Sequence, residues 1–201
     1  MRRERTFKKS LLFLAIMSIM IFAMSITASA AATNIKQTDS SKTSVDISWD
    51  GTNTTDTYKV FWLKTENGTY TPVTSSTSSS KTRWVSGLNA GTTYYVKVAT
   101  YSGYNAPNYY SISAPLQVIT TPDAVDYSTI KQTAGTPTSI TIAWGKVAGA
   151  SGYIVKKSGS TSKAISKNSV TVTATAGQRY GLEVVTYKKA PKTGYIAKSS
   201  T

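Results

Sequence analysis

The sequence predicts an all-β protein made of two tandem antiparallel β-sandwiches that follow an N-terminal signal peptide. Three observations favour this fold class: short strands with a period of two, an internal repeat over most of the chain, and no helical stripe after residue 30. The chain has 201 residues, a net charge of +14, and neither histidine nor cysteine. This composition excludes thiolate zinc sites, disulfides, and Ser-His-Asp or Cys-His nucleophiles.

Residues 1–30 have the three parts of a secretory signal peptide. Basic residues crowd the first ten positions, and an apolar run of about 14 residues follows at 11–24. Small residues at Ala28, Ala30 and Ala32 then favour cleavage after Ala30 or after Ala32. A membrane anchor is the alternative interpretation, but a spanning helix needs roughly 20 apolar residues. We therefore expect a secreted or cell-surface protein with no membrane span after signal cleavage.

The rest of the chain repeats itself, first with an offset of 95 positions and later with one of 86. Residues 35–38 recur at 130–133, and four single positions recur with them: Trp49 as Trp144, Tyr58 as Tyr153, Gly91 as Gly177, and Tyr94 as Tyr180. A loop deletion between shared strands explains why the offset falls. A repeat of this length indicates two homologous domains rather than a solenoid, whose units are shorter. We place them at 33–121 and 126–201.

Alternation of apolar and polar residues locates the strands. In the first repeat it runs through 44–49, 58–63 and 94–99, and in the second through 140–144 and 180–184. Short, Val/Thr/Tyr-rich runs of this kind are typical of half-buried antiparallel strands. The spacing predicts about seven strands per repeat, as in a β-sandwich.

The last strand of the second repeat has two interpretations. The first repeat closes with a strand at 113–120, but an alignment of Tyr110 with Tyr195 leaves residues 116–120 without a counterpart. Either residues 194–201 form a short final strand, or the domain is truncated and has an open sheet edge, which would be prone to pair with other chains. The sequence leaves both interpretations open.

These residues together resemble the fibronectin type III family. Each repeat has a Trp at the end of its second strand (Trp49, Trp144) and a Tyr at the start of its third. Residues 88–94, Leu-Asn-Ala-Gly-Thr-Thr-Tyr, resemble the family's Leu-x-Pro-x-Thr-x-Tyr signature, while Tyr180 keeps the Gly and Tyr without the Leu. The resemblance implies immunoglobulin-like sandwiches in tandem, with Tyr94 and Tyr180 as corner residues whose hydroxyls bond to nearby backbone. With a signal segment that looks bacterial, it points to a secreted bacterial protein.

Two groups of surface residues are candidates for binding. Residues 101–110 lie between two strands and contain four tyrosines, of which Tyr104, Tyr109 and Tyr110 are candidates for contact with sugars or protein. In the alternative interpretation, Tyr109 and Tyr110 only pack on the last strand. The second group lies in the basic repeat: 122–201 has 11 basic and 3 acidic residues (+8), against 7 and 5 (+2) for 33–121. Its candidates for contact with polyanions are five lysines: Lys156, Lys157, Lys188, Lys189 and Lys192.

No catalytic or metal-binding constellation is present in the sequence. The loop at 50–56 holds two carboxylates, whereas a calcium site needs about six oxygens. We therefore expect no metal, no cofactor, no nucleic-acid partner and no enzymatic activity in this chain. The predicted function is a non-catalytic extracellular interaction or spacer module, with a cell-envelope polyanion, a glycan or another extracellular protein as partner. Alternatively, the domains accompany a larger secreted glycan hydrolase or other enzyme whose catalytic part is absent from this chain.

Overall fold

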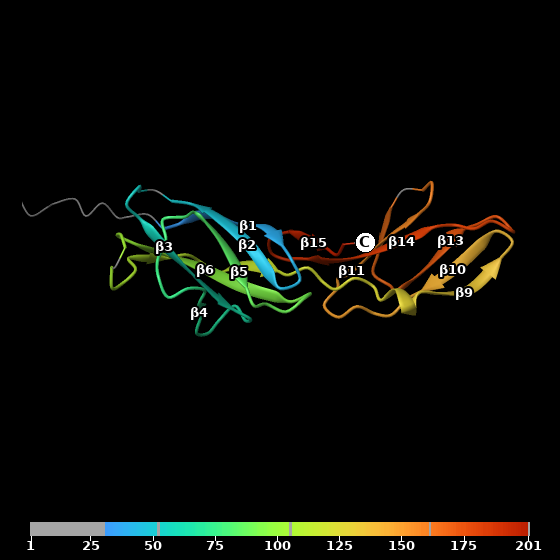
Figure 1. Ribbon diagram of the computed structural model, residues 1–201, viewed down its shortest axis with the longest axis horizontal. Coiled ribbons are helices and arrows are strands. Elements are labelled where there is room, and N and C mark those ends of the chain that lie inside the picture. Colours follow the sequence, from blue (N-terminus) through green and yellow to red (C-terminus); the bar gives the residue numbers. More distant parts are fainter. Residues whose placement is uncertain (1–30, 52, 105, 161, 201) are drawn as a thin grey trace, which may run out of the picture. The chain divides into compact units, whose positions relative to one another are not determined.

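The computed structural model describes residues 31–51, 53–104, 106–160 and 162–200. These residues form strands, turns and one short 3₁₀ turn, η1 (Tyr127–Thr129), and residues 31–201 are grouped into one compact unit. The all-β fold class predicted from the sequence is confirmed (Figure 1). The signal peptide predicted at 1–30 lies outside the described residues, so it stays a prediction. Within the described ranges, no helix is long and apolar enough to cross a membrane.

The first repeat contains two antiparallel sheets. One has the order β1-β2-β5, formed by Thr33–Ser40, Ser44–Asp50 and Thr82–Ser86. The other has the order β4-β3-β6-β7, formed by Thr71–Pro72, Thr57–Leu63, Thr93–Tyr101 and Ser111–Ile112. An additional strand, β8 (Leu116–Ile119), also pairs with β6. β6 is thus covered along nearly its whole outer edge by β7 and β8 in turn.

The second repeat contains a similar pair of sheets. The order β13-β10-β9 is formed by Ser169–Thr173, Ser139–Ala143 and Lys131–Thr136. The order β12-β11-β14-β15 is formed by Lys163–Ile165, Gly152–Lys157, Leu182–Lys189 and Ile196–Lys198. Two predicted strand ends differ from the structure, because β10 stops one residue before Trp144 and β14 begins two residues after Tyr180. The domain boundaries at 33–121 and 126–201 stay a prediction.

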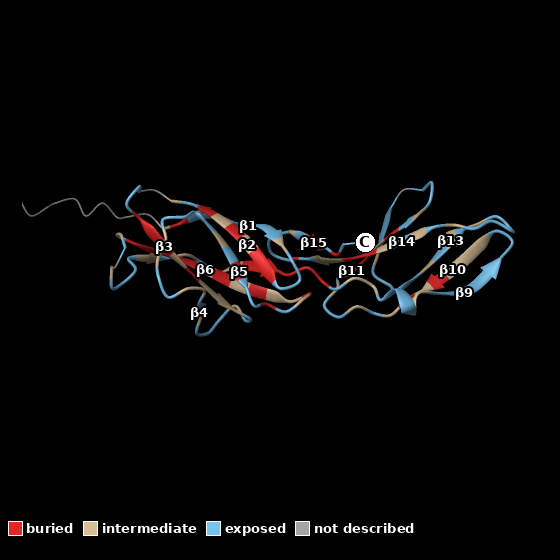
Figure 2. Cartoon of the chain, in the orientation of Figure 1, coloured by how far each residue is buried: buried red, intermediate tan, exposed pale blue. Residues whose placement is uncertain are grey.

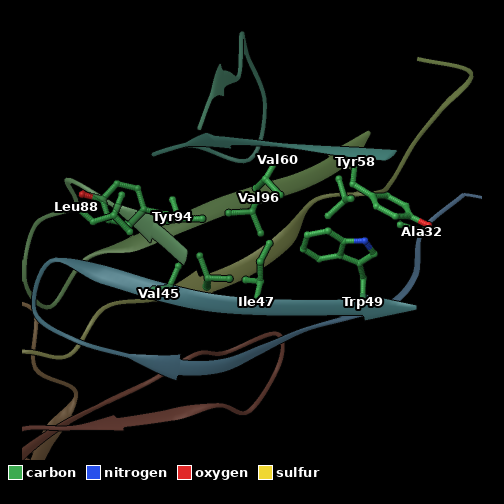
Figure 3. Packing of buried hydrophobic residues seen from close by; sticks show 12 residues of the cluster. Ala32, Val45, Ile47, Trp49, Tyr58, Val60, Leu88, Tyr94 and Val96 are labelled. Carbon is green, nitrogen blue, oxygen red and sulfur yellow. The ribbon is translucent and has the colours of Figure 1, made fainter. Parts of the chain in front are cut away.

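The first core lies between its two sheets. Side chains from β2, β5, β3, β6 and β8 form one buried cluster, in which Val45, Ile47, Val96 and Val98 have no exposed surface (Figure 3). The alternation of the sequence produces this core, since every second residue of β2 points inward. The second core has four buried residues surrounded by half-buried ones. Figure 2 shows the contrast: β2 is buried along most of its length, and β9 is exposed throughout.

Both cores contain an edge-to-face pair of Trp and Tyr. The rings of Trp49 and Tyr58 have their centroids 5.5 Å apart at 67°, and those of Trp144 and Tyr153 are 5.2 Å apart at 75°. Neither indole nitrogen has a hydrogen-bond partner among the described residues. An aromatic face is a weak acceptor for such an N–H group. Figure 3 shows the Trp49 nitrogen on the side of the indole that faces Tyr58.

Each repeat has a tyrosine corner next to the start of its sixth strand, β6 in the first repeat and β14 in the second. The backbone N–H of Asn89 donates to the Tyr94 hydroxyl at 2.9 Å, and the N–H of Thr175 donates to the Tyr180 hydroxyl at 2.9 Å. Gly91 and Gly177 precede these tyrosines with φ of 57° and 76°. Only glycine adopts this left-handed region without strain, which explains why both repeats have Gly three residues before the Tyr.

Candidate binding surfaces

The segment between β6 and β7 is fixed by one buried tyrosine and one backbone contact. Tyr101, the last residue of β6, is buried, and its ring packs edge-to-face on Tyr109 with centroids 6.1 Å apart. The Thr57 hydroxyl donates to the carbonyl of Gly103 at 2.8 Å. Burial, followed by the neighbouring Tyr109 hydroxyl, raises the pKa of Tyr101 above 10.0, so its hydroxyl stays protonated at neutral pH. The loop therefore packs on a buried aromatic ring.

A surface cavity of about 380 Å³ opens beside this ring. Its wall on the loop side is made by Tyr101, Tyr104 and Pro107, and its other wall by Lys59 and the chain at 75–77. Lys59 donates from its Nζ to the Ser75 carbonyl at 2.8 Å, which holds the parts of this second wall together. The Tyr104 side chain is 59% exposed. The cavity thus combines an exposed aromatic ring with an ammonium group, hydroxyls and backbone carbonyls, which form a mixed set of donors and acceptors.

The other two candidate tyrosines do not line this cavity. Tyr109 is 48% exposed and contributes through its contact with Tyr101. Tyr110 is exposed too, and its backbone N–H donates to the carbonyl of Thr100, which anchors the far end of the loop on β6. Of the three predicted tyrosines, Tyr104 alone contributes to the cavity wall, while Tyr109 and Tyr110 flank it.

The candidate lysines fall into two groups at opposite ends of one sheet. Lys156 and Lys157 pair with Glu183 and Leu182 at the beginning of β14, whereas Lys188 and Lys189 are at its end. Six residues along a strand span roughly 20 Å at about 3.3 Å per residue. The structure therefore does not bring the five lysines together into one patch.

The first of these groups has one exposed and one engaged lysine. Lys156 is exposed and lines a surface hollow of about 450 Å³ with Gly181, Leu182 and Glu183. Lys157 donates from its Nζ to the carbonyl of Thr173 at 2.7 Å, and the same ammonium lies 4.3 Å from the centroid of the Tyr180 ring. This cation–π contact holds the Lys157 side chain against the sheet.

The second group is also engaged in contacts within the protein. The Lys188 ammonium donates to the Gly149 carbonyl at 3.1 Å, and burial lowers its pKa. Lys192 donates from its side chain to the Glu66 carboxylate and from its backbone N–H to the Gln117 side chain. The hydrogen bond with Glu66 raises the pKa of Lys192. Lys189 and Lys192 are exposed, whereas Lys188 is half-buried.

Several surface features were not found by sequence reasoning. Lys59 and Ser75 line the cavity although they are distant from Tyr104 in sequence, and no local motif marks them. Trp84 is 64% exposed on β5, opposite Asp46 of β2. In the predicted 50–56 loop, Asp50 accepts a hydrogen bond from the Asn34 amide at 2.7 Å. Across the described ranges, no group of three or more His, Cys, Asp or Glu residues is arranged to hold a metal ion.

Comparison with known proteins gives a family for the first repeat. Residues 30–115 match the family model described as Fibronectin type III domain. No match was found among curated proteins. Among solved structures, a two fibronectin type-III domain segment from chicken tenascin is 16% identical, with a TM-score of 0.43, and the alignment covers 85% of this chain and 98% of that one. The FN1–FN3 domains of chicken CNTN1 are 13% identical, with a TM-score of 0.44 and coverage of 85% and 66%.

The matched residues include β1 to β7 and stop before β8, so the likeness of the second repeat to this family stays a prediction. Within the match lie Trp49, Tyr58 and the corner at Tyr94, the residues that carried the resemblance in the sequence. The segment 30–115 is a fibronectin type III domain.

Proposed function

We propose that this chain is a non-catalytic extracellular interaction module and that its first repeat binds a glycan in the cavity beside Tyr104. The observation that carries this proposal is the cavity itself, about 380 Å³ with an exposed tyrosine ring on one wall and Lys59 on the other. Small-ligand sites are concave, and a few placed polar groups in them fix the ligand's orientation. A tyrosine ring offers a flat apolar face to a sugar ring and a hydroxyl to its edge.

The rigidity of the cavity supports this interpretation. Tyr101 is buried beneath the loop, and Thr57 holds the carbonyl of Gly103. A site with an ordered floor loses little conformational entropy when a ligand binds. A sugar has both apolar ring faces and hydroxyls, and the Lys59 ammonium and the carbonyls at 75–77 are partners for those hydroxyls.

Titration of the full chain with soluble oligosaccharides tests the proposal. The probes are β-1,4-linked oligomers of N-acetylglucosamine and of glucose, and binding is followed by calorimetry. We expect Tyr104→Ala to weaken binding about fivefold, as a lost stacking contact of about 1 kcal/mol would. Tyr127→Ala is the matched control, because Tyr127 is 82% exposed in η1 and remote from the cavity in sequence. Equal affinity of Tyr104→Ala and the unaltered chain for a bound sugar would contradict the proposal.

A second candidate function, binding of cell-envelope polyanions, rests on the charge of the second repeat. Its +8 net charge comes from 11 basic and 3 acidic residues, and Lys156 and Lys189 are exposed. A net charge of this size attracts anionic polymers at long range. A module of this kind also fits a role beside the catalytic part of a larger secreted enzyme.

A further inference from the structure

Position 157 of the second repeat corresponds to position 62 of the first, but it holds a lysine where the first repeat has a tryptophan. The offset of 95 that relates the core tryptophans also relates Trp62 to Lys157. The strand pairings agree, because Trp62 lies opposite Val96 of β6 and the second side chain lies opposite Leu182 of β14. Since Val96 and Leu182 are related by the later offset of 86, the two side chains start from equivalent places in the two repeats.

In the first repeat, the Trp62 indole fills the space beside the tyrosine corner. It packs against the buried cluster of the first core, and its ring meets that of Tyr94 edge-to-face, with the centroids 5.3 Å apart at 77°. Val85 of β5, in the opposite sheet, is only 1% exposed. This part of the first core is therefore closed by an aromatic side chain.

In the second repeat, Lys157 starts from the place of the indole and reaches the opposite sheet. Its ammonium donates to the carbonyl of Thr173 in β13 at 2.7 Å. The same ammonium lies 4.3 Å from the centroid of the Tyr180 ring, the corner residue that corresponds to Tyr94. The lysine thus contacts the corner tyrosine as the indole does in the first repeat, but its linear stem has less bulk than an indole ring.

The wall opposite Lys157 is also less covered than its counterpart. Val172 of β13 pairs with Ile140. Val85 of β5 pairs with Val45, the residue that corresponds to Ile140. Val172 is thus the counterpart of Val85, but it is only half-buried. A cavity of about 170 Å³ opens here, where the first repeat has its indole.

The lining of this cavity combines apolar with cationic side chains. Its valines are Val155, Val170 and Val172, and its lysines are Lys157 and Lys163. Among the described residues that line it, none is acidic. An ammonium has three N–H groups, so Lys157 has donors beyond the one that it uses, and Lys163 is exposed on β12. A ligand that fits this lining has an apolar body and a negative charge.

We propose that this cavity binds a small aromatic carboxylate. Its ring would lie on the valines, in the place that the Trp62 indole takes in the first repeat, and its carboxylate would accept hydrogen bonds from Lys157 and Lys163. An apolar cavity of about 150 Å³ is large enough for benzene, and hydrogen bonds between an ammonium and a carboxylate are stronger than those between neutral groups. The site lies at the β12 edge of its sheet, away from β15, and is independent of glycan binding in the first repeat.

Titration of the unaltered full chain with indole-3-acetate, followed by NMR of the valine methyl groups, tests the proposal. This probe joins the ring system of tryptophan to a carboxylate. We expect the methyl signals of Val155, Val170 and Val172 to move with a dissociation constant of about 1 mM, as for a ligand of this size. The methyl signals of Val60 and Val85, in the first core, are internal controls and should not move. Indole-3-acetamide, which has the same ring and no charge, should bind about fivefold more weakly.

Substitutions of lysines separate the cavity from general attraction by the basic repeat. Lys157→Trp introduces the residue of the first repeat, fills the cavity and should weaken binding of indole-3-acetate more than about tenfold. Lys163→Gln removes one ammonium and should weaken this binding about twofold. Lys131→Gln is the matched control and should leave the affinity unchanged, because Lys131 is exposed on β9 and does not line the cavity.

The proposal is overturned if the three valine methyl groups do not move at about 10 mM indole-3-acetate, where a site of about 1 mM affinity would be mostly filled. Equal affinity for indole-3-acetate and indole-3-acetamide would overturn the role of the lysines. Equal losses in Lys163→Gln and Lys131→Gln would show that net charge, and not the cavity, attracts the probe. These comparisons decide the question even if Lys157→Trp fails to fold.

Discussion

The two repeats share their local motifs and differ in how completely their cores are closed. Each has an edge-to-face Trp–Tyr pair and a tyrosine corner with a backbone N–H donated at 2.9 Å. In the first repeat β8 completes the sheet, and the core has twelve buried residues. In the second, β15 covers only the end of β14, and four residues are buried. Local motifs therefore form without full coverage, whereas the burial of the core depends on the last strand.

The hydroxyls of the paired tyrosines show a second difference. The Tyr153 hydroxyl accepts a hydrogen bond from the backbone N–H of Val147 at 2.9 Å. The Tyr58 hydroxyl is buried and has no hydrogen-bond partner among the described residues, and the Oδ2 atom of the neighbouring Asp56 is in the same situation. Burial of polar groups without partners lowers stability. The better covered repeat thus contains the less satisfied polar groups.

Truncation of the core tryptophans should give the largest effects. Trp49→Ala leaves a cavity in the closed first core, and we expect a loss of about 3–5 kcal/mol in the free energy of unfolding. Trp144→Ala should cost less, because its core has four buried residues and the hydrophobic residues packed against them are only partly buried. Denaturant titration with amide signals resolved for each repeat measures both. A loss below about 1 kcal/mol for Trp49→Ala, or a larger loss for Trp144→Ala, would contradict the comparison.

Removal of the corner hydroxyls should lower the free energy of unfolding by a smaller amount, and again by more in the first repeat than in the second. Tyr94→Phe leaves the Asn89 N–H without its acceptor, and we expect the first repeat to lose about 1–2 kcal/mol. Tyr180→Phe should cost less, since its turn is exposed and water can replace the hydroxyl. The unfolding midpoints of the two variants provide the test. If the Tyr94→Phe midpoint equals that of the unaltered chain, the corner bond contributes nothing measurable.

Alkaline pH should change the stability of the first repeat relative to that of the second. Burial raises the pKa values of Tyr58 and Tyr101 above 10.0, while the Thr175 N–H, bonded to the Tyr180 hydroxyl, lowers the pKa of Tyr180. A raised folded-state pKa contributes stability below pH 10 that is lost as pH rises through that pKa, and a lowered one contributes stability as pH rises toward 10.

The first repeat should therefore lose stability as the pH rises above about 10, because its tyrosines ionise more readily when unfolded, and the second should lose less. Amide exchange of Val98 and Val155 at pH 9, 10 and 11, corrected for the intrinsic rate, compares the two cores. Tyr101→Phe reduces the loss in the first repeat if ionisation of this tyrosine causes it. Parallel behaviour of both repeats over this range would show that tyrosine ionisation does not distinguish them.

The parts of the fold set by local pattern could be predicted from the sequence. Alternation located β2, β3 and β6, because one face of each packs on the core, and the Leu88–Tyr94 spacing predicted the corner that Asn89 closes. Contacts between distant segments could not be predicted. Lys59 reaches Ser75 across 16 positions, and Lys192 reaches Glu66 across 126. No local pattern encodes these pairings, because they depend on sheet register and loop paths.

The smallest expected effects are those of single lysines on polyanion binding. Here the comparison is between lysines of the second repeat whose ammonium groups differ in their contacts. Lys156, Lys189 and Lys192 are exposed, but the ammonium of Lys192 already contacts Glu66, as that of half-buried Lys157 contacts Tyr180. An ammonium bound to a carboxylate contacts a polyanion less readily, because it must first leave its partner, and long-range attraction does not compensate since salt screens it beyond about 8 Å. Exposed lysines should therefore contribute more to polyanion binding than engaged ones.

Binding of the full chain to a heparin column as a model polyanion measures this order. Lys156→Gln and Lys189→Gln should each lower the affinity about twofold, the effect of an exposed ion pair worth about 0.5 kcal/mol. Lys192→Gln should change it less, since the Lys192 ammonium would have to leave Glu66 before it could contact the polyanion, and Lys36→Gln in the first repeat is the matched exposed control. Added salt should weaken binding of every form because the attraction is screened. Binding that is insensitive to salt and is weakened by Tyr104→Ala would instead show that the polyanion binds in the cavity beside Tyr104 in the first repeat.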